Sequence, residues 1–336
     1  MGKNKKLLII TFIVLAAVLS GVYYLIYVPI SKTNNKGVDF RIGTKADVDF
    51  VARSLKRKGL VRSYIFTKYY FMINKIKLNV GVYEFNQTMP LKRIFEMINS
   101  GETDKNIIMV TIPEGYTVKQ IAEKLKALDV IKDVDKFIME AQTGKFEYEF
   151  IQGIKDRPSR LEGYLFPDTY EFKKGMSEHD IINIMLKRFN DIYVKNIKGK
   201  VNKDGYTVDE IIIIASIVER EAKLKEERPK VAAVFYNRLK KDIKLESCAT
   251  IQYILGTPKE KLTLEDLKIE SPYNTYKNKG LPIGPICNPG LDSIIAALNP
   301  ADVDYLYFLV NEDKRDGSHY FTNSYEEFLK QKHKKK

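Results

Sequence analysis

The sequence predicts an α+β protein with one N-terminal transmembrane helix. Three observations lead to this fold class: an uncharged run of 22 residues near the N-terminus, helical and strand patterns that follow no regular alternation, and a hydrophobic content of 44%. At 336 residues the chain is long enough for one large or two ordinary domains with a substantial core.

The predicted membrane anchor is the run LLIITFIVLAAVLSGVYYLIYV, residues 7–28. A helix of this length, at about 1.5 Å per residue, crosses a hydrocarbon core of roughly 30 Å. Lys3, Lys5 and Lys6 precede the run, so we expect residues 1–6 in the cytoplasm and the remaining chain on the extracytoplasmic side. A cleaved signal peptide is the alternative, but the run is longer than a usual signal core and no small-x-small site follows it.

Residues 29–39 form a polar linker, and the segment after it has a counterpart later in the chain. An apolar pattern recurs 70 positions on, and YEFNQTM recurs 87 positions on as YEFKKGM. The residues of the apolar pattern are Ile42, Val48, Val51, Ala52 and Leu55. Two offsets in one order predict a duplicated unit, residues 42–98 and 112–185, with 17 extra residues in the second copy between Leu125 and Tyr170. Insertions of this kind often form loops that carry function. Chance similarity between two amphipathic helices and two short strands is the alternative.

Capping patterns mark the starts of three helices. Thr44 with Asp47 matches a capping box, and so does Thr207 with Glu210, which begins a helix over the apolar stretch IIIIASIVE. Pro229 suits the first turn of the following helix, PKVAAVFYNRLKK.

The C-terminal third also contains a stiff loop and a hairpin. Residues 271–290, SPYNTYKNKGLPIGPICNPG, form a loop rich in Pro and Gly that either walls a cleft or merely connects two elements. Residues 305–310 and 319–322 read as the two strands of a hairpin around DKRDG.

Charge and rare residue types narrow the possible functions. The net charge of +13 suits anionic lipid, an anionic wall polymer or nucleic acid, and the predicted topology removes nucleic acid. The three histidines are far apart in no ligand spacing, so neither a metal nor another cofactor is expected. The sequence has no nucleophile elbow, phosphate-binding loop, dinucleotide fingerprint or HExxH motif. Cys248 and Cys287 form either an oxidised pair or two free buried thiols.

Glu219 is the first candidate for chemistry, because it follows the apolar stretch IIIIASIV directly. On a helix it shares a face with Ile212, Ala215 and Ser216. Burial among such neighbours favours a protonated acid, which can donate to a leaving oxygen. The alternative, which the pattern alone favours, is a solvated helix end where Glu219 pairs with Lys223.

Two other regions are weaker candidates. Glu162 and Asp168 flank aromatic residues in LEGYLFPDTY, a composition suited to sugars because rings stack on pyranose faces and carboxylates accept from hydroxyls. An ordinary tight loop with a packed aromatic core is equally compatible with it. Asn237 and Arg238 form either a polar anchor or a plain helix surface.

Six motifs follow one another in a fixed order: LEGYLFPDTY, ASIVEREA, VAAVFYNRL, LESCATIQYILG, SPYNTY and GLPIGPICNPG. Together, behind one anchor, they resemble the endolytic murein transglycosylase family, also called YceG-like, over roughly residues 40–330. The resemblance implies a LysM-like module over residues 40–101 and a catalytic domain over residues 102–336. It also implies that Glu219 is the catalytic acid. The substrate-binding residues that it implies are Glu162, Tyr164, Asp168, Ser216, Asn237, Tyr273, Asn274 and Asn288.

Lytic transglycosylases break the β-1,4 bond between N-acetylmuramic acid and N-acetylglucosamine without water. By resemblance, Glu219 protonates the glycosidic oxygen and then takes the proton of the muramoyl 6-hydroxyl as a 1,6-anhydro ring closes. One acid suffices because the nucleophile belongs to the substrate. Cys248 and Cys287 depart from the family pattern, which commonly has aspartate and serine there, and we hypothesise that the two thiols are close enough to bridge.

The expected function is therefore internal cleavage of nascent peptidoglycan strands near the membrane, which limits their length. The expected partners are glycan strands and the peptidoglycan synthases. The alternative is a non-catalytic protein that binds the wall and acts as a scaffold for the synthesis machinery.

Overall fold

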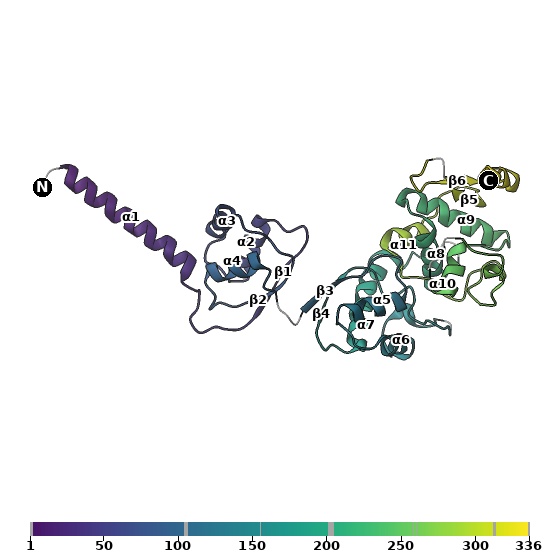
Figure 1. Cartoon of the computed structure of the whole chain (residues 1–336), viewed down its shortest axis with the longest axis horizontal. Coiled ribbons are helices and arrows are strands. Elements are labelled where there is room, and N and C mark those ends of the chain that lie inside the picture. The colour runs from purple at the N-terminus through teal and green to yellow at the C-terminus, as the bar shows by residue number, and fades with distance from the viewer. Residues whose placement is uncertain are drawn as a thin grey trace. The chain divides into compact units, whose positions relative to one another are not determined.

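The structure is a computed structural model that describes residues 3–103, 107–154, 156–200, 205–257, 259, 261–311 and 314–334. The chain divides into two units, residues 1–107 and 108–336 (Figure 1). Each unit has its own cluster of buried apolar side chains.

The first unit begins with a long apolar helix, α1 (Lys3–Tyr27). Its stretch Ile9–Tyr27 has a mean hydropathy of 2.4 and is not buried by the rest of the protein. A helix of this length and composition can span a membrane, and a signal sequence has the same properties.

The body of the first unit is a two-stranded sheet that encloses two helices in sequence. Strand β1 (Val38–Ile42) pairs antiparallel with β2 (Gly81–Phe85), and Phe40 lies opposite Tyr83. Helices α2 (Val48–Arg57) and α3 (Tyr64–Ile73) connect the strands and contact each other, and α4 (Leu91–Ser100) follows β2.

The expected capping box of Thr44 and Asp47 is wrong in one respect. Asp47 itself is the N-cap of α2, and its carboxylate accepts from the Phe50 backbone N–H at 2.7 Å. Thr44 lies in the preceding turn, where the Ala46 N–H donates to the Gly43 carbonyl. Aspartate caps a helix as well as threonine does, so the sequence offered two possible starts.

The second unit opens with the same order of elements as the first. The elements are β3 (Ile107–Thr111), α5 (Val118–Ala127), α6 (Val134–Thr143), β4 (Thr169–Lys173) and α7 (Glu178–Ile192), and β3 pairs with β4. Helices α5 and α6 lie 70 positions after α2 and α3, and α7 starts 87 positions after α4. The predicted duplication is therefore confirmed. The extra residues lie in the connection 144–168, which contains the short helix η1 (Glu149–Ile151), whereas the first copy has only residues 74–80 there.

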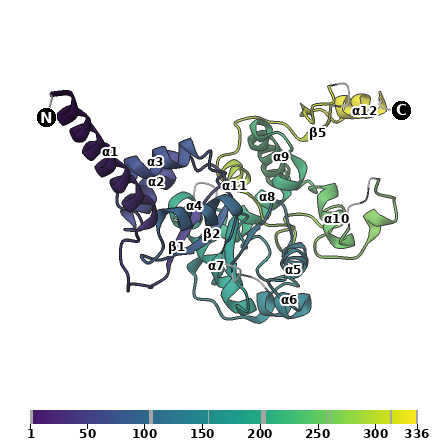
Figure 2. The same ribbon diagram turned by 60° about the vertical axis from the view of Figure 1, so that its left-hand side comes forward.

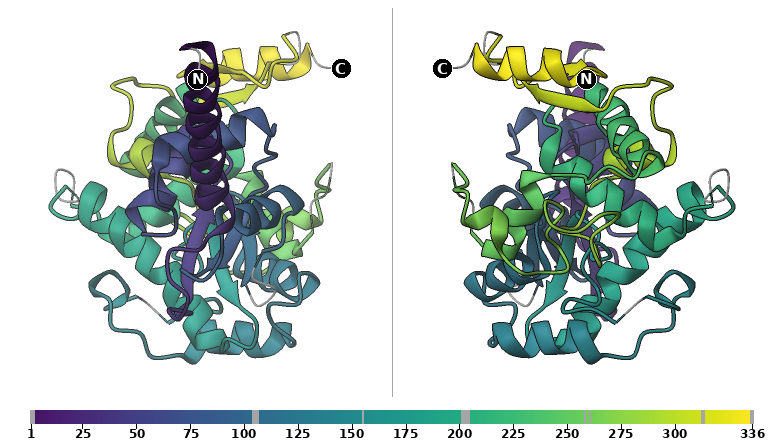
Figure 3. Two further views of the ribbon diagram at one scale, coloured as in Figure 1. Left: turned by 90° about the vertical axis from the view of Figure 1, so that its left-hand side faces the viewer. Right: turned by 90° about the vertical axis from the view of Figure 1, so that its right-hand side faces the viewer.

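The rest of the second unit is mainly helical. Its elements are η2 (Tyr193–Ile197, a π-helix), α8 (Val208–Glu221), η3 (Lys225–Glu227), α9 (Arg228–Lys240), α10 (Cys248–Leu255), η4 (Asp266–Lys268), α11 (Leu291–Leu298), β5 (Tyr307–Val310), β6 (His319–Thr322) and α12 (Tyr325–His333). Helices α8, α9 and α11 pack against one another (Figure 2). Strands β5 and β6 form the predicted hairpin, with Tyr307 opposite Thr322, and α12 packs on it (Figure 3). Asp313 of the expected turn lies outside the described residues.

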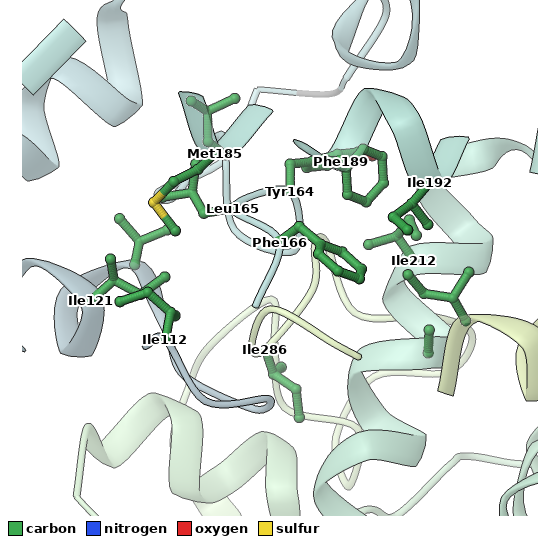
Figure 4. Packing of buried hydrophobic residues seen from close by; sticks show 14 of the residues in the cluster. Ile112, Ile121, Tyr164, Leu165, Phe166, Met185, Phe189, Ile192, Ile212 and Ile286 are labelled. Carbon is green, nitrogen blue, oxygen red and sulfur yellow. The ribbon is translucent and has the colours of Figure 1, made fainter. Parts of the chain in front are cut away.

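Helix α8 runs through the core of this unit. The predicted capping box is present: Thr207 accepts from the Glu210 N–H, and the Glu210 carboxylate accepts from the Thr207 N–H. All eight residues 211–218 are buried, which explains why the stretch is apolar on every face. Figure 4 shows Tyr164 and Phe189 packed near Ile212 of this helix.

Candidate active site

Glu219 lies where α8 leaves the core. The eight residues before it are buried, and its own side chain is only 6% exposed. The carboxyl group is therefore held almost out of water at the end of an apolar helix, and the solvated helix end that the pattern alone favours is wrong.

The partners of Glu219 come from two other helices. Arg228, the first residue of α9, donates from Nη2 to Glu219 Oε1 at 3.0 Å and from Nη1 to Oε2 at 3.4 Å. Gly290, which precedes α11, donates its backbone N–H to Glu219 Oε2 at 3.0 Å. The expected pairing with Lys223 is wrong, because the carboxylate turns inward to a guanidinium that is itself 7% exposed. All of these groups are hydrogen-bond donors that point at the two carboxyl oxygens of Glu219.

Glu114 is a second carboxyl group at this site, and the sequence reading missed it. Its Oε2 lies 3.9 Å from Arg228 Nη1, so one guanidinium faces two acids. A Cβ built on Gly290 would lie 2.1 Å from Glu114 Cδ, so a larger residue at position 290 would displace the Glu114 carboxyl group from this position. Burial, and next the negative charge of Glu219, raise the pKa of the Glu114 carboxyl.

A cavity of about 590 Å³ has Arg220, the residue after Glu219, in its wall. The Arg220 guanidinium donates to the Gly115 carbonyl at 3.5 Å, and among the described residues neither Glu219 nor Glu114 is in the wall. The loop of residues 271–290 contributes part of the wall, so it walls a cavity as well as connecting two elements. The wall includes Thr117, Gln120, Glu162, Arg220, Gln252, Tyr253, Ser271, Tyr273 and Ile286.

Glu162 belongs to this wall but is only 2% exposed. Its Oε1 accepts from the Val118 N–H at 3.0 Å and from Asn288 Nδ2 at 3.1 Å, and its Oε2 lies 3.2 Å from the Tyr253 hydroxyl. Burial raises the pKa of Glu162 to about 8. The group is therefore mainly protonated at neutral pH, and its hydrogen bonds are already made within the protein.

Asn288 connects three loops around the cavity. Its amide nitrogen donates to Glu162 and to the Tyr116 carbonyl, and its amide oxygen accepts from the Leu165 N–H at 2.8 Å. Its backbone also pairs with the loop of residues 115–116 on both sides. The residue is fully buried, so in this structure it acts as part of the scaffold of the site, and contact with a substrate stays a prediction.

Tyr164 and Ser216 are also scaffold residues. Tyr164 is fully buried and donates to Asp209 Oδ1 at 2.7 Å. Ser216 donates to the Ile213 carbonyl and accepts from the Ile286 N–H at 3.0 Å, which fixes the loop 271–290 against α8. Among the described residues, neither is in the wall of the cavity.

Asn237 of α9 and Asn274 of the loop 271–290 also bond to backbone groups. Asn237 donates to the carbonyls of Val303 and Tyr305, and Asn274, which is fully buried, donates to the Leu267 carbonyl. Asn237 is thus a polar anchor, one of the two readings that its sequence allowed. Both amides hold backbone carbonyls of the protein, and their role as substrate ligands stays a prediction.

Asp168 and Tyr273 differ in their position relative to the cavity. Asp168 is 39% exposed and pairs with Arg188 at 2.6 Å, away from the described wall of the cavity. Tyr273 lines the cavity, with its ring centroid 4.9 Å from that of Tyr253. Of the eight predicted substrate-binding residues, Glu162 and Tyr273 are in the wall.

The two cysteines are free, and the hypothesis that they bridge is wrong. Cys248 is exposed at the start of α10, where its sulfur lies 3.0 Å from the Tyr276 hydroxyl. Cys287 is fully buried and contacts the Ser216 carbonyl at 3.3 Å. Burial, then the charges of Glu219 and Glu162, raise the pKa of its thiol, which therefore lies near both acids. In the part of the chain that the structure describes, no group of three or more potential ligands is arranged for a metal ion.

The sequence profile of the YceG-like family matches residues 40–334. The chain belongs to the YceG-like family. A protein of Bacillus subtilis (strain 168) named endolytic murein transglycosylase is 36% identical over 320 residues, which are 91% of this chain and 87% of that protein. A protein of the same name from Streptococcus pneumoniae (strain R6) is 33% identical, over 96% of this chain but 64% of its own length. A crystal structure of a YceG-like protein from Listeria monocytogenes has a TM-score of 0.60 and 33% identity, and covers 88% of this chain and 99% of that chain.

Membership of the YceG-like family confirms the resemblance that the six motifs gave. Glu219 lies in one of those motifs, whereas Glu114 and Arg228 lie outside all six. The position of Arg228 just before Pro229 at a helix start was the only local signal for it, and Glu114 had none.

Proposed function

We propose that this chain is a membrane-anchored lytic endotransglycosylase that cleaves the β-1,4 bond between N-acetylmuramic acid and N-acetylglucosamine. One observation carries the proposal: Glu219 is nearly buried and bound by Arg228 and the Gly290 N–H, and the next residue, Arg220, lines a cavity of about 590 Å³. Family membership supports it, because relatives at 33–36% identity are named endolytic murein transglycosylases.

In the proposed reaction Glu219 first gives a proton to the glycosidic oxygen. The bond from this oxygen to the anomeric carbon of the muramoyl residue breaks, and the sugar ring passes through an oxocarbenium-like state. The 6-hydroxyl of the same sugar then attacks the anomeric carbon, and Glu219, now a carboxylate, accepts the hydroxyl proton. The products are a 1,6-anhydro-muramoyl end and a free 4-hydroxyl on N-acetylglucosamine, and no water is consumed.

Arg228 and the Gly290 N–H have a defined role in this scheme. Between the two proton transfers Glu219 carries a negative charge next to a cationic sugar. Three fixed donors at 3.0–3.4 Å stabilise that charge without reorganisation, which is the most effective form of electrostatic stabilisation in a site with little water. They also keep the carboxyl group in one position for both transfers.

The cavity is the proposed binding site for the glycan next to the bond that breaks. Its volume lies in the range of ligand pockets, and it combines the rings of Tyr253 and Tyr273 with polar groups. Tyrosine rings offer apolar faces to sugars and hydroxyl groups to their substituents. Arg220 lines the cavity and follows Glu219 in the chain, so it is suited to contact a sugar near the bond that breaks.

The location of the site follows from the anchor. We propose that α1 crosses the cell membrane with its N-terminus in the cytoplasm, and that both units are extracytoplasmic. The β1-α2-α3-β2 arrangement of the first unit supports a LysM-like module that holds glycan. An active site tethered to the membrane meets strands while they are polymerised, so cleavage limits their length, and the peptidoglycan synthases are the expected partners.

The test uses the full chain in detergent with purified glycan strands and mass analysis of the products. Wild type should release fragments with 1,6-anhydro ends, and Glu219→Gln should lose on the order of 10² to 10⁴ in rate, because removal of a general acid typically costs that much. Glu226→Gln, at an exposed acid seven residues away, is the matched control and should cleave normally. Equal cleavage by Glu219→Gln and wild type would contradict the assignment, and no cleavage by wild type would favour a non-catalytic scaffold.

A further inference from the structure

Helix α3 carries apolar side chains on two opposite faces. Thr67 and Phe71 are buried in the core of the first unit. Four apolar side chains on the other side are 52–77% exposed: Ile65, Tyr69, Met72 and Ile73. Their spacing of i, i+4, i+7 and i+8 forms one continuous stripe. We call these four residues the α3 stripe. A contiguous exposed apolar stripe marks a surface that another phase or molecule covers.

The fold does not require apolar residues at these positions. The duplicated unit contains the same helix as α6, 70 positions further on. There the residues equivalent to the stripe are Asp135, Met139, Gln142 and Thr143, so three of the four are polar. Both helices occupy the same place in a β-α-α-β unit, yet only α3 has the stripe. The stripe is therefore a property of the first unit and not of the scaffold.

The α3 stripe lies close to the point where α1 ends. Arg62, which precedes the N-cap Ser63 of α3, donates to the Val28 carbonyl at 2.8 Å and to the Pro29 carbonyl at 2.6 Å. Its guanidinium also lies 4.6 Å from the ring centroid of Tyr24 on the last turns of α1. Helix α3 thus starts within hydrogen-bonding distance of the end of α1.

Two further contacts fix the same arrangement. Lys92 of α4 lies 5.3 Å from the ring centroid of Tyr27, the last residue of α1. Tyr70 of α3 has a raised pKa, caused first by burial and next by the nearby Tyr27 hydroxyl. Tyr24 and Tyr27 are aromatic residues of the kind that lie at a membrane interface, so the first unit is attached directly at that interface.

The segment around the α3 stripe is basic overall, although Asp49 lies 2.6 Å from both Arg53 and Lys68. Residues 50–83 contain eight Lys and Arg and no Asp or Glu. A helix with an exposed apolar face and basic surroundings is typical of segments that lie in the plane of an anionic lipid surface. A protein partner would not need this arrangement at the base of a membrane span.

We propose that the α3 stripe inserts into the outer leaflet of the same membrane that α1 crosses, so that two attachments hold the first unit against the lipid surface. This inference rests on the proposed membrane anchor. The partner is the lipid surface itself, with its acyl-chain boundary around the apolar stripe and anionic headgroups around the lysines and arginines. A second attachment fixes the orientation of the first unit about the α1 axis, which a single helix does not.

The test exploits the absence of tryptophan from the sequence. Tyr69→Trp places a single fluorophore in the α3 stripe of the full chain, reconstituted in phosphatidylglycerol vesicles with or without lipids brominated on the acyl chains. Because an interfacial helix buries its apolar face ~5–10 Å into the headgroup and acyl boundary, we expect at least about twofold quenching and blue-shifted emission. Tyr325→Trp, at a tyrosine that is 58% exposed in the second unit, is the matched control and should show neither.

A second variant replaces three residues of the α3 stripe by their equivalents in α6. Ile65→Asp, Met72→Gln and Ile73→Thr, made in the Tyr69→Trp chain, should remove the quenching and leave α1 in the vesicles. If the Tyr69→Trp emission is not quenched in a vesicle-bound chain, insertion of the α3 stripe into the membrane is overturned. If that unquenched emission is also blue-shifted, protein, such as a second copy of the chain, covers the α3 stripe instead. A chain that does not float with the vesicles overturns the anchor as well.

Discussion

The ion pair between Arg228 and Glu219 allows a quantitative prediction. Both side chains are nearly buried, at 7% and 6% exposure, and they share two hydrogen bonds. Arg228→Met removes the cation, keeps most of the side-chain volume and leaves a buried acid with the Gly290 N–H as its remaining partner. Breaking a buried pair from one side costs about 3–5 kcal/mol. For a unit of 229 residues, 108–336, this lowers the melting temperature by roughly 6–20 °C.

The assay compares the unfolding of wild type and variants by urea and by heat, with the full chain in one detergent. Arg188→Met is the matched control, because the pair between Arg188 and Asp168 is 2.6 Å long but 39–40% exposed. Exposed pairs contribute at most about 1 kcal/mol. The double variant Arg228→Met with Glu219→Gln should be more stable than Arg228→Met alone, because no uncompensated charge remains buried.

A loss of less than about 1 kcal/mol in Arg228→Met, equal to that of the control, would refute this reasoning. It would mean that water reaches Glu219 and replaces the guanidinium. The same result would remove the argument that fixed donors stabilise the carboxylate during cleavage.

Three further predictions concern the surroundings of the site. Burial raises the pKa of Glu162 from its ordinary 4.5 to about 8, so the stability that this group contributes below pH 4.5 should be lost progressively as the pH rises to about 8. Glu162→Gln mimics the protonated form, so its stability should increase relative to that of wild type between pH 5 and 9. A stability difference that does not depend on pH would contradict the raised pKa. Gly163→Ala should lower the free energy of unfolding in urea by several kcal/mol, because φ is +92° and a Cβ there would lie 2.7 Å from two neighbouring side chains. Gly175→Ala, with φ of +79° and open space around it, should lower it by only about 1–2 kcal/mol. Equal losses in the two variants would show that the packing around residue 163 relaxes. A thiol reagent should label Cys248 in the native protein and Cys287 only after denaturation, and rapid native labelling of both would contradict the burial of Cys287.

The repeats and helix boundaries could be predicted because they depend on local periodicity. The offset of 70 residues related α5 correctly to α2, and the capping box at Thr207 gave the start of α8. The choice between Thr44 and Asp47 failed because both are good caps and only the turn before them decides.

The site was predicted less completely, because its geometry depends on contacts between distant segments. Glu219 stood out by its position after an apolar run, but its partners Arg228 and Gly290 lie 9 and 71 residues away in sequence. Residue type alone could not separate ligands from scaffold. Asn274 and Asn288 have the composition of sugar-binding residues, yet their amides hold backbone groups in the fold.

Isotope labelling of the products tests the central claim, that Glu219 moves one proton from sugar to sugar and that no water enters. Glycan strands are digested by the full chain in H₂¹⁸O, and the new muramoyl ends are weighed. The account predicts 1,6-anhydro ends without ¹⁸O, and no such ends from Glu219→Gln. Muramoyl ends that are 20 mass units heavier than the anhydro form, through addition of one H₂¹⁸O, would contradict it and would make the protein a hydrolase.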